Sequence, residues 1–245
     1  MKKVAVVTGA AQGIGFSVVK KLASEGIKVA MADLNQSKIT EAAQNLMADG
    51  YDVKAFVCDV ANPDSLAALM DQTIDYYGQL DILVNNAGII IPGDFDAIEE
   101  ADWDNVLSVN LKGVYFGIQK ALPYLRKSSC ARIINMSSVA GRMGAFESPM
   151  SYVASKGGII SLTYGLARKL ANTGITVNAV CPGTVESPLF KHAGPGQLDN
   201  LLANIPMGRF GTPEDIANGV AFLASESASY ITGHCLDING GMFIH

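Results

Sequence analysis

A glycine-rich turn, Thr8-Gly9-Ala10-Ala11-Gln12-Gly13-Ile14-Gly15, directly follows the apolar run Val4–Thr8. Glycines at such a point allow a tight turn and let the backbone approach a pyrophosphate closely. The helix that we expect over Ile14–Ser24 would meet the phosphate charge with its first N–H groups and the positive end of its dipole. A glycine-rich turn is a weak signal by itself, but its place between a strand and a helix predicts a dinucleotide site.

Short β-rich runs alternate with longer segments of helical period along most of the chain. The expected strands are apolar throughout, so both faces of the sheet should be covered by helices. This alternation predicts an α/β fold: a doubly wound, mostly parallel Rossmann sheet with helices on both faces. The expected strands are Val4–Thr8, Lys28–Asp33, Val53–Asp59, Ile82–Asn85, Arg132–Ser137 and Thr176–Cys181, and the expected helices are Ile14–Ser24, Lys38–Ala48, Ser65–Tyr77, Trp103–Leu125 and Tyr152–Asn172.

The length of 245 residues suits one domain, because single α/β domains commonly reach this size. Apolar residues make up 49% of the chain and charged residues 17%, which excludes a disordered chain and fits a sheet buried on both faces. No linker, low-complexity tract or repeat divides residues 1–245. The one long irregular segment runs from Pro182 to about Gly211, and we expect residues 187–206 within it to form a substrate lid.

Charge and hydropathy exclude several classes of function. The net charge of −5 and the sequence pI of about 5.2 argue against nucleic-acid binding. No stretch approaches the roughly eighteen apolar residues of a membrane helix, and Met1-Lys2-Lys3 leads into a strand-like run rather than a signal peptide. We therefore expect a cytoplasmic protein without a membrane or nucleic-acid partner.

The cysteines and histidines show no metal-ligand spacing. The cysteines lie far apart, each in or beside an apolar run, which indicates buried, reduced thiols. The histidines form no His-x-x-x-His pair, so we expect no metal site. These residues are Cys58, Cys130, Cys181, Cys235, His192, His234 and His245.

The second expected strand ends at Asp33, 18 residues after Gly15. At about 20 residues from the last glycine, a carboxylate meets the adenosine ribose hydroxyls in dinucleotide-binding folds, and it would repel a 2′-phosphate. Leu34 and Asn35 follow this carboxylate and Gln12 lies in the glycine turn, so these positions offer such a phosphate no cation. NAD is therefore the expected cofactor. The alternative role for Asp33 is to cap the next helix.

Tyr152 and Lys156 have the i, i+4 spacing that places two side chains on one helix face. A phenol normally loses its proton near pH 10, and a shift to about 7 requires roughly 4 kcal/mol of preference for the phenolate. An adjacent lysine cation and a positively charged nicotinamide ring would supply that preference. The spacing alone is common by chance, so the pair becomes informative only with the other motifs.

These motifs together resemble those of the short-chain dehydrogenase/reductase family, and the resemblance covers essentially the whole chain. Jointly they are highly specific. In family order they are the turn Thr8–Gly15, Asp59, Asn85-Asn86-Ala87-Gly88, Asn110, Ser137-Ser138, Tyr152-x-x-x-Lys156, Asn178 and Pro182-Gly183.

The resemblance implies roles for four residues. Tyr152 would be the general acid/base, and Ser138 would orient the carbonyl or hydroxyl oxygen of the substrate. Lys156 would bind the nicotinamide ribose and lower the pKa of Tyr152, while Asn110 would hold a water in the proton relay. The hydride belongs to the cofactor, so no protein nucleophile is needed.

The resemblance also implies which residues contact the cofactor. Asp59 and Val60 would hold the adenine, and Asn86, Ala87 and Gly88 would line the adenosine ribose. Pro182, Gly183 and Val185 would meet the nicotinamide amide, and the hydroxyl of Ser187 would reach the same group. Asn86 and Gly88 could instead only shape a turn, and we expect Asn178 to make structural hydrogen bonds outside the site. The full set is Gly9, Gln12, Gly13, Ile14, Gly15, Asp33, Leu34, Asp59, Val60, Asn86, Ala87, Gly88, Tyr152, Lys156, Pro182, Gly183, Val185 and Ser187.

The spacing between the serine and the tyrosine departs from the family pattern. Ser138 and Tyr152 are 14 positions apart, one more than the family usually shows. We therefore expect the loop Gly141–Ser151 to bulge. The choice between Ser137 and Ser138 stays open at this point, with Ser138 preferred.

The expected reaction is hydride transfer between NAD and a small secondary alcohol or ketone, such as a polyol, sugar or hydroxy acid. The segment from Cys181 to Pro188 resembles that of NAD-dependent members acting on hydroxy acids and sugar acids. The alternative is a 3-oxoacyl-[acyl-carrier-protein] reductase. Thr173, where such reductases often carry a basic residue, and Asp33, which conflicts with their usual NADP preference, argue against it. A dinucleotide-sensing regulator is the non-enzymatic alternative, and no Gly-x-Ser-x-Gly elbow indicates a hydrolase.

The substrate contacts and the assembly are expected as follows. Lys191 and His192 in the lid are candidates for polar contacts with the substrate. We expect a homotetramer that pairs through the two long helices and the tail Asp237–His245. In the opposite wall, Met143, Phe146 and Met150 would offer apolar contact and Glu147 would meet hydroxyls.

Overall fold

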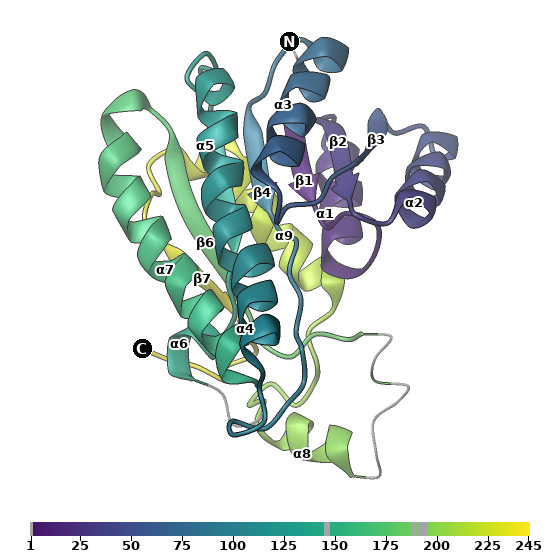
Figure 1. Cartoon of the computed structure of the whole chain (residues 1–245). Coiled ribbons are helices and arrows are strands. Elements are labelled where there is room, and N and C mark those ends of the chain that lie inside the picture. The colour runs from purple at the N-terminus through teal and green to yellow at the C-terminus, as the bar shows by residue number, and fades with distance from the viewer. Residues whose placement is uncertain (1, 145–147, 188–189, 191–195) are drawn as a thin grey trace.

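Seven parallel strands form one sheet in the order β3-β2-β1-β4-β5-β6-β7 (Figure 1). The computed structural model describes residues 2–144, 148–187, 190 and 196–245. The sheet confirms the doubly wound fold, because the order reverses direction at β1. The strands are β1 Val4–Thr8, β2 Lys28–Asp33, β3 Val53–Val57, β4 Ile82–Asn85, β5 Arg132–Met136, β6 Thr176–Pro182 and β7 Cys235–Ile238.

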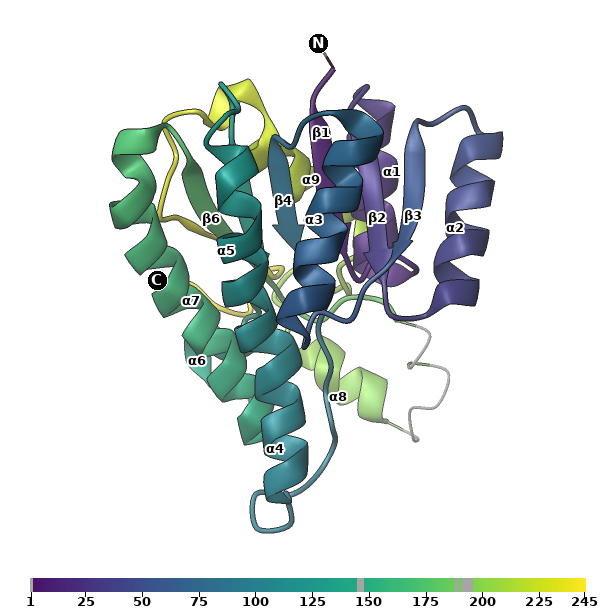
Figure 2. The same ribbon diagram turned by 45° about the horizontal axis from the view of Figure 1, so that its top comes forward.

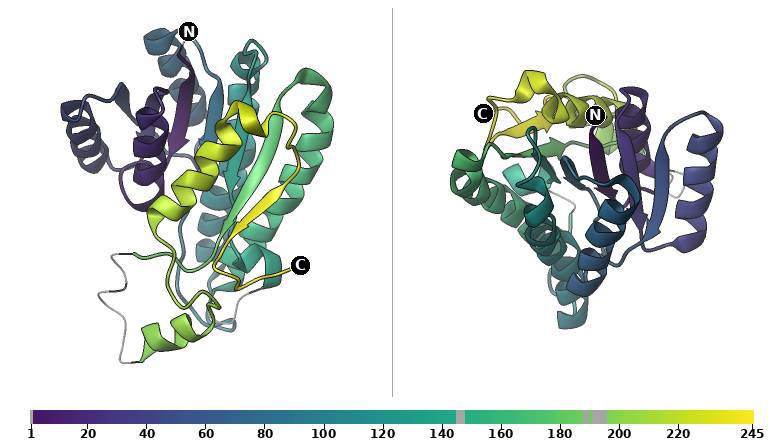
Figure 3. Two further views of the ribbon diagram at one scale, coloured as in Figure 1. Left: turned by 180° about the vertical axis from the view of Figure 1, so that it is seen from behind. Right: turned by 90° about the horizontal axis from the view of Figure 1, so that it is seen from above.

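Helices cover both faces of the sheet, as the apolar strands predicted (Figures 2 and 3). Val7 of β1 belongs to one buried cluster, which α1, α2 and α9 share, while its neighbour Val6 belongs to another, formed with α3, α5 and α7. Successive side chains of a strand point to opposite faces of the sheet, so each face of β1 is buried by its own set of helices. The helices are α1 Gly13–Ser24, α2 Gln36–Ala48, α3 Pro63–Tyr77, α4 Glu100–Leu107, α5 Gly113–Leu125, α6 Ala140–Met143, α7 Met150–Leu170, α8 Gln197–Ala203 and α9 Pro213–Ala224.

Side-chain caps set where several helices begin. Asn35 accepts the backbone N–H of Lys38 at the start of α2, and Asn62 accepts those of Asp64 and Ser65 at the start of α3. Each cap satisfies donors that the first turn of a helix leaves unpaired. Because of these caps, α2 and α3 each begin two residues before the expected Lys38 and Ser65.

The expected helix Trp103–Leu125 is wrong in its start and its continuity. It begins at Glu100 and is interrupted by a π-helical turn, Ser108–Lys112, between α4 and α5. Asn110 lies in that turn and is fully buried. A π turn accommodates an extra residue and often marks a functional site, but the helical period of the sequence does not reveal it.

Several short elements were not expected. The segment from Pro182 to about Gly211 is not wholly irregular, because it contains α8. Sequence analysis also missed α6, α9 and β7. The third strand ends at Val57 instead of Asp59, and the fifth ends at Met136 instead of Ser137. The sixth strand extends one residue further than expected, to Pro182.

The cysteines differ from expectation in one respect. Cys130 is only partly buried, whereas the other three are buried as expected. Cys181 and Cys235, which are far apart in the sequence, lie on neighbouring strands in one small buried cluster with Ile160 and Ala179. Within the described residues, no group of cysteine, histidine and acidic side chains has the arrangement of a metal site. In the same part of the chain, no helix is long and apolar enough to cross a bilayer.

The packing of α1 against the glycine turn gives a stability prediction. A Cβ atom on Gly15 would collide with the carbonyl oxygen of Gly9 and lie 2.5 Å from Nδ2 of Asn86. Gly15→Ala should therefore lower the free energy of unfolding by about 3 kcal/mol. Gly165→Ala in α7 is the control, because its methyl group would meet no atom within 4 Å outside the adjoining backbone of the helix, so this variant should be at least as stable as the wild type. Chemical denaturation that finds both variants as stable as the wild type would contradict this account of the turn.

Candidate active site

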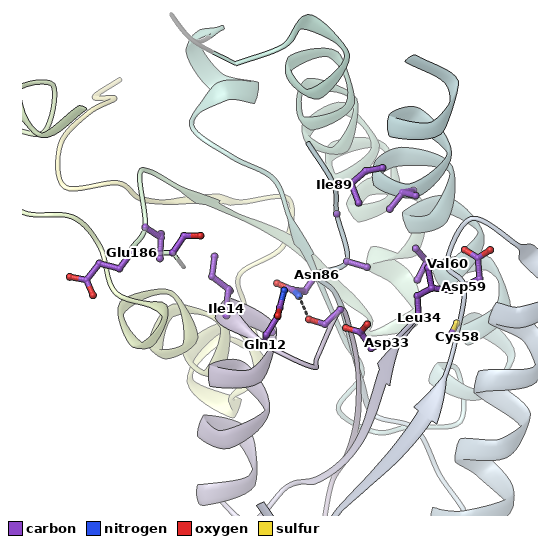
Figure 4. A pocket seen from close by; sticks show the side chains of 18 residues that line it. Gln12, Ile14, Asp33, Leu34, Cys58, Asp59, Val60, Asn86, Ile89 and Glu186 are labelled. Carbon is purple, nitrogen blue, oxygen red and sulfur yellow. Dashed lines mark hydrogen bonds between the residues drawn. The ribbon is translucent and has the colours of Figure 1, made fainter. Parts of the chain in front are cut away.

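A cavity of about 500 Å³ opens at the carboxyl ends of β1, β2 and β4 (Figure 4). This is the edge where doubly wound sheets bind ligands, at the reversal of the strand order. Its lining residues are Gly9, Gln12, Gly13, Ile14, Gly15, Asp33, Leu34, Cys58, Asp59, Val60, Asn86, Ala87, Gly88, Ile89, Val109, Val185, Glu186 and Ser187.

Most of the expected cofactor contacts line this one cavity. Of that set, only Tyr152, Lys156, Pro182 and Gly183 are absent from the lining. Sequence analysis missed four lining residues: Cys58, Ile89, Val109 and Glu186. Each of them directly adjoins an expected site residue in the chain, so extending the motifs by one position would have found them.

Asn86 ties the end of β4 to the glycine turn. Its Nδ2 donates to the carbonyl oxygens of Thr8, at 2.9 Å, and Gly9, at 3.0 Å. The hydroxyl of Thr8 accepts the backbone N–H groups of Asn86 and Ala87, each at 3.1 Å. Asn86 therefore both shapes the turn and lines the cavity, so its two proposed roles are compatible.

The glycine turn fits a pyrophosphate. Gly13 has a φ of +58°, and a Cβ built on it would meet no atom within 4 Å. The backbone there faces open space that a side chain would fill, and no acidic residue lies in the first turn of α1. Free N–H groups and the positive end of a helix dipole at such a place suit a phosphate.

Asp33 is held by two backbone groups at the rim of the cavity. Its Oδ2 accepts the N–H of Ala11, at 3.2 Å, and its Oδ1 accepts the N–H of Asn35, at 3.0 Å. Asp33 does not cap α2, because Asn35 performs that function. The alternative role of Asp33 as the cap of this helix is therefore wrong. Its neighbour Leu34 is 68% exposed and offers the cavity an apolar surface.

Asp59 and Val60 form the far wall beside Cys58. Oδ1 of Asp59 accepts the N–H of Ala61 at 2.9 Å, which fixes the carboxylate after β3. Burial raises the pKa of the Cys58 thiol, although a hydrogen bond from Ser65 opposes the shift. A protonated thiol and apolar Val60 are compatible with the flat face of an adenine.

Tyr152 and Lys156 lie in the first two turns of α7 and share one face, as their spacing predicted. Nζ of Lys156 lies 5.5 Å from the centre of the Tyr152 ring and donates to the carbonyl oxygen of Met136, at 2.7 Å. Lys156 is only 4% exposed. The ammonium is therefore oriented by β5 and held below the ring.

The two serines have separate partners, which favours Ser138 as the residue beside the substrate. The hydroxyl of Ser137 donates to the carbonyl oxygen of Lys156, at 2.8 Å, so it joins β5 to α7. The hydroxyl of Ser138 instead accepts the backbone N–H of Ala140, at 3.1 Å, and Ser138 acts to lower the pKa of Tyr152, which places it beside the phenol. The bulge expected within Gly141–Ser151 partly involves residues 145–147, which lie outside the described residues.

Asn110 connects the cavity to the catalytic group. Its Oδ1 accepts the N–H of Ile89, at 2.8 Å, and its Nδ2 donates to the carbonyl oxygen of Ile89 and to the hydroxyl of Ser155. A Cβ on Gly88 would lie 3.4 Å from Oδ1 of Asn110 and 3.5 Å from Nζ of Lys156. The cavity wall at Gly88 is therefore in direct contact with two of the four expected catalytic side chains.

Burial governs the ionisation of this group. It lowers the pKa of Lys156 to about 8. It also raises the pKa of Tyr152, although the hydrogen bond with Ser138 acts in the opposite direction. Desolvation of the phenol outweighs the opposing contribution in this structure. That Lys156 lowers the pKa of Tyr152 stays a prediction. A phenol that keeps its proton is the form that can act as an acid.

Two of the expected cofactor contacts near the end of β6, Pro182 and Gly183, also join elements of the fold. The carbonyl oxygen of Pro182 accepts the N–H of Val139, and a Cβ on Gly183 would lie 2.8 Å from Cα of Asn239. Asn178 binds the carbonyl oxygen of Ile231 and the N–H of His234, which confirms its structural role.

The expected substrate contacts are only partly described. Lys191, His192, Phe146 and Glu147 lie outside the described residues. Met143 and Met150 are 42% and 40% exposed, so both offer apolar surface to solvent.

Comparison with known proteins identifies the family. A family model described as enoyl-(acyl carrier protein) reductase matches residues 9–243. A mutant of a Serratia marcescens short-chain dehydrogenase/reductase has a TM-score of 0.92 and 37% identity, covering 98% of this chain and 97% of that one. The chain belongs to the short-chain dehydrogenase/reductase family, and it is an oxidoreductase that acts on a CH–OH or keto group.

Particular relatives align along the full length. The 3-oxoacyl-[acyl-carrier-protein] reductase FabG of Staphylococcus aureus (strain N315) is 43% identical over 245 residues, covering 100% of this chain and 99% of that protein. The protein of the same name from Thermotoga maritima is 38% identical over 242 residues, covering 99% and 98%. The crystal structure of gox2181 has a TM-score of 0.95 at 33% identity and covers 98% of this chain and 95% of that one.

The burial of Lys156 predicts a pH dependence of stability. Its pKa is about 8 in the folded chain and 10.5 in its ordinary state. Between these values the unfolded chain binds more protons, so the free energy of unfolding should rise with pH. Relative to Lys156→Met, the wild type should gain up to about 3 kcal/mol over this window.

Urea denaturation at several pH values measures this difference. Lys169→Met is the control, because Lys169 is exposed on the same helix. If the difference in the free energy of unfolding between the wild type and Lys156→Met does not change between pH 8 and 10.5, Lys156 titrates normally.

Proposed function

We propose that this enzyme reduces 3-oxoacyl thioesters to 3-hydroxyacyl thioesters. The observation that carries the proposal is the similarity along the full chain to FabG proteins named for that substrate. Sequence analysis preferred a small polyol, sugar or hydroxy acid, but the comparisons support its alternative better. Thr173, where a basic residue was expected, does not outweigh similarity over the entire chain.

A second cavity at the start of α7 supports an acyl substrate. Its volume is about 310 Å³; Phe95, Ile98, Trp103 and Met150 provide its apolar lining, and Glu99 and Glu100 add two carboxylates. Ser151, the neighbour of Tyr152 in the chain, also lines it. Phe95 is 85% exposed, which is costly in water without an apolar ligand or partner. An acyl chain that extends from the reacting carbonyl would cover such side chains.

The chain's own residues provide the proton and the orientation. Tyr152, whose pKa is raised by burial, donates its phenolic proton to the ketone oxygen. Ser138 hydrogen-bonds the same oxygen and stabilises the negative charge that develops on it. Lys156 and Asn110 adjoin the wall at Gly88 and position the ligand there. A nicotinamide dinucleotide in the main cavity supplies the hydride.

The cofactor that we propose as preferred is NAD. Asp33 is a fixed carboxylate in the cavity lining, and it can accept hydrogen bonds from ribose hydroxyls. Its charge opposes a 2′-phosphate. The residues proposed to hold the rest of the cofactor are the glycine turn, Asp59 and Val60 at the adenine, and the stretch from Val185 to Ser187 toward the nicotinamide.

Residues 187–206 are proposed to close over the substrate. Their far end is anchored: a Cβ on Gly241 would lie 3.2 Å from Pro206, and the N–H of Met207 donates to the carbonyl oxygen of Gly240. At the near end, the N–H of Glu186 donates to the carbonyl oxygen of Gly211, so the segment is tied at both ends and is suited to local movement between them.

The enzyme is also proposed to be a homotetramer. A groove lined by Leu107, Leu111, Tyr115, Phe116 and Leu162 runs between α4, α5 and α7. Apolar side chains gathered on one face are typical of an interface. Tyr115→Lys should therefore reduce the mass found by light scattering, whereas Tyr76→Lys on α3 should not, although both tyrosines are about half-exposed. A wild-type monomer at micromolar concentration would contradict the proposal.

The test of catalysis compares substrates and two tyrosine variants. The wild type should reduce acetoacetyl thioesters, and Tyr152→Phe should lose roughly 10² to 10⁴ in turnover while still binding the cofactor. Tyr230→Phe is the control, because Tyr230 is fully exposed. Loss in both variants, or in neither, would contradict the role of Tyr152.

Comparison of turnover between substrates tests the proposed substrate class separately. Turnover of polyols, sugars or hydroxy acids without turnover of any acyl thioester would support the small polar substrate instead. The family assignment would survive that result.

A further inference from the structure

A lysine reaches the mouth of the main cavity at the end that holds Asp33. Nζ of Lys38 lies 3.2 Å from Oε1 of Gln12, which lines the cavity and precedes α1. Lys38 is the third residue of α2, so this contact joins the turn after β1 to the turn after β2. Sequence analysis did not find this cation, because Lys38 lies five residues beyond Asp33 and meets Gln12 only through the fold.

The charge of Lys38 is not neutralised by a carboxylate. Among the ion pairs between described residues, none includes Lys38. Gln12 is neutral and occupies one of the three N–H donors of the ammonium. Asp33 is meanwhile held by the backbone N–H groups of Ala11 and Asn35. One end of the cavity therefore presents a fixed carboxylate and a separate, available cation.

These two charges have opposite effects on the two common dinucleotides. A carboxylate accepts hydrogen bonds from a free ribose 2′-hydroxyl and repels a 2′-phosphate. An ammonium forms charge-assisted hydrogen bonds with a phosphate. Lys38 and Gln12 are both exposed. Because exposed polar contacts are weak, the flexible lysine can exchange Gln12 for a phosphate at little cost.

We propose that Lys38 binds the 2′-phosphate of NADP and so allows the enzyme to use NADP as well as NAD. This inference rests on the proposed function, since it requires a dinucleotide in the main cavity. Gln12 holds the ammonium beside the cavity when the 2′-position carries a hydroxyl. The phosphate displaces Gln12 as the partner of Lys38 and offsets the repulsion from Asp33.

Binding of adenosine 2′,5′-bisphosphate and of AMP tests the assignment without turnover. Calorimetry should find that Lys38→Gln weakens binding of the bisphosphate about tenfold or more, because a charge-assisted contact is lost, and changes AMP binding less than twofold. Lys38→Arg should retain the affinity for the bisphosphate. Lys20→Gln removes the same charge from an exposed position on α1 and should change the affinity for neither ligand.

Cofactor kinetics give a second readout. In Lys38→Gln, the ratio of kcat/KM with NADP to kcat/KM with NAD should fall about tenfold. The difference in this ratio between the wild type and Lys38→Gln should shrink as the salt concentration rises. Asp33→Asn should raise the same ratio.

The outcomes separate this inference from the proposed function. Equal effects on both nucleotides, no effect on either, or failure of both to bind the wild type would overturn the role of Lys38. If the nucleotides respond as expected but no ketone is reduced with either cofactor, the proposed function fails while the assignment of Lys38 stands.

Discussion

The site depends on the hydrogen bonds between Asn86 and the glycine turn. Through Nδ2, the end of β4 holds the carbonyl oxygens of Thr8 and Gly9, and this keeps the turn open toward the cavity. The same strand end continues into Gly88, which lies against Lys156 and Asn110. A single connection therefore positions the glycine turn relative to Lys156 and Asn110.

The second constraint is the burial of Lys156. An ammonium in so dry a place has a lowered pKa, and the carbonyl oxygen of Met136 partly compensates for the lost water. Ser137 reinforces the arrangement by binding the backbone of Lys156. Tyr152 lies beside it, and desolvation raises the pKa of its phenol. β5 and α7 thus hold the ammonium of Lys156 beside the ring of Tyr152.

Sequence reasoning was strongest where apolar runs decide the structure. The strands at Val4–Thr8 and Lys28–Asp33 have the predicted ends, because continuous apolar residues between polar turns admit few alternatives. The same motifs located nearly the whole cavity lining. The π turn at Asn110, the pKa of Tyr152 and the contact of Lys38 with Gln12 could not be predicted. Each depends on packing between segments far apart in the chain, about which local pattern carries no information.

Transfer of a labelled hydride tests the central claim most directly. The enzyme would be incubated with an acetoacetyl thioester and with NADH or NADPH deuterated at either face of nicotinamide C4, and the product would be weighed by mass spectrometry. The account predicts one deuterium at C3 of the 3-hydroxyacyl product from only one of the two labelled faces. A product without deuterium from either face, or no product with either cofactor, would contradict it.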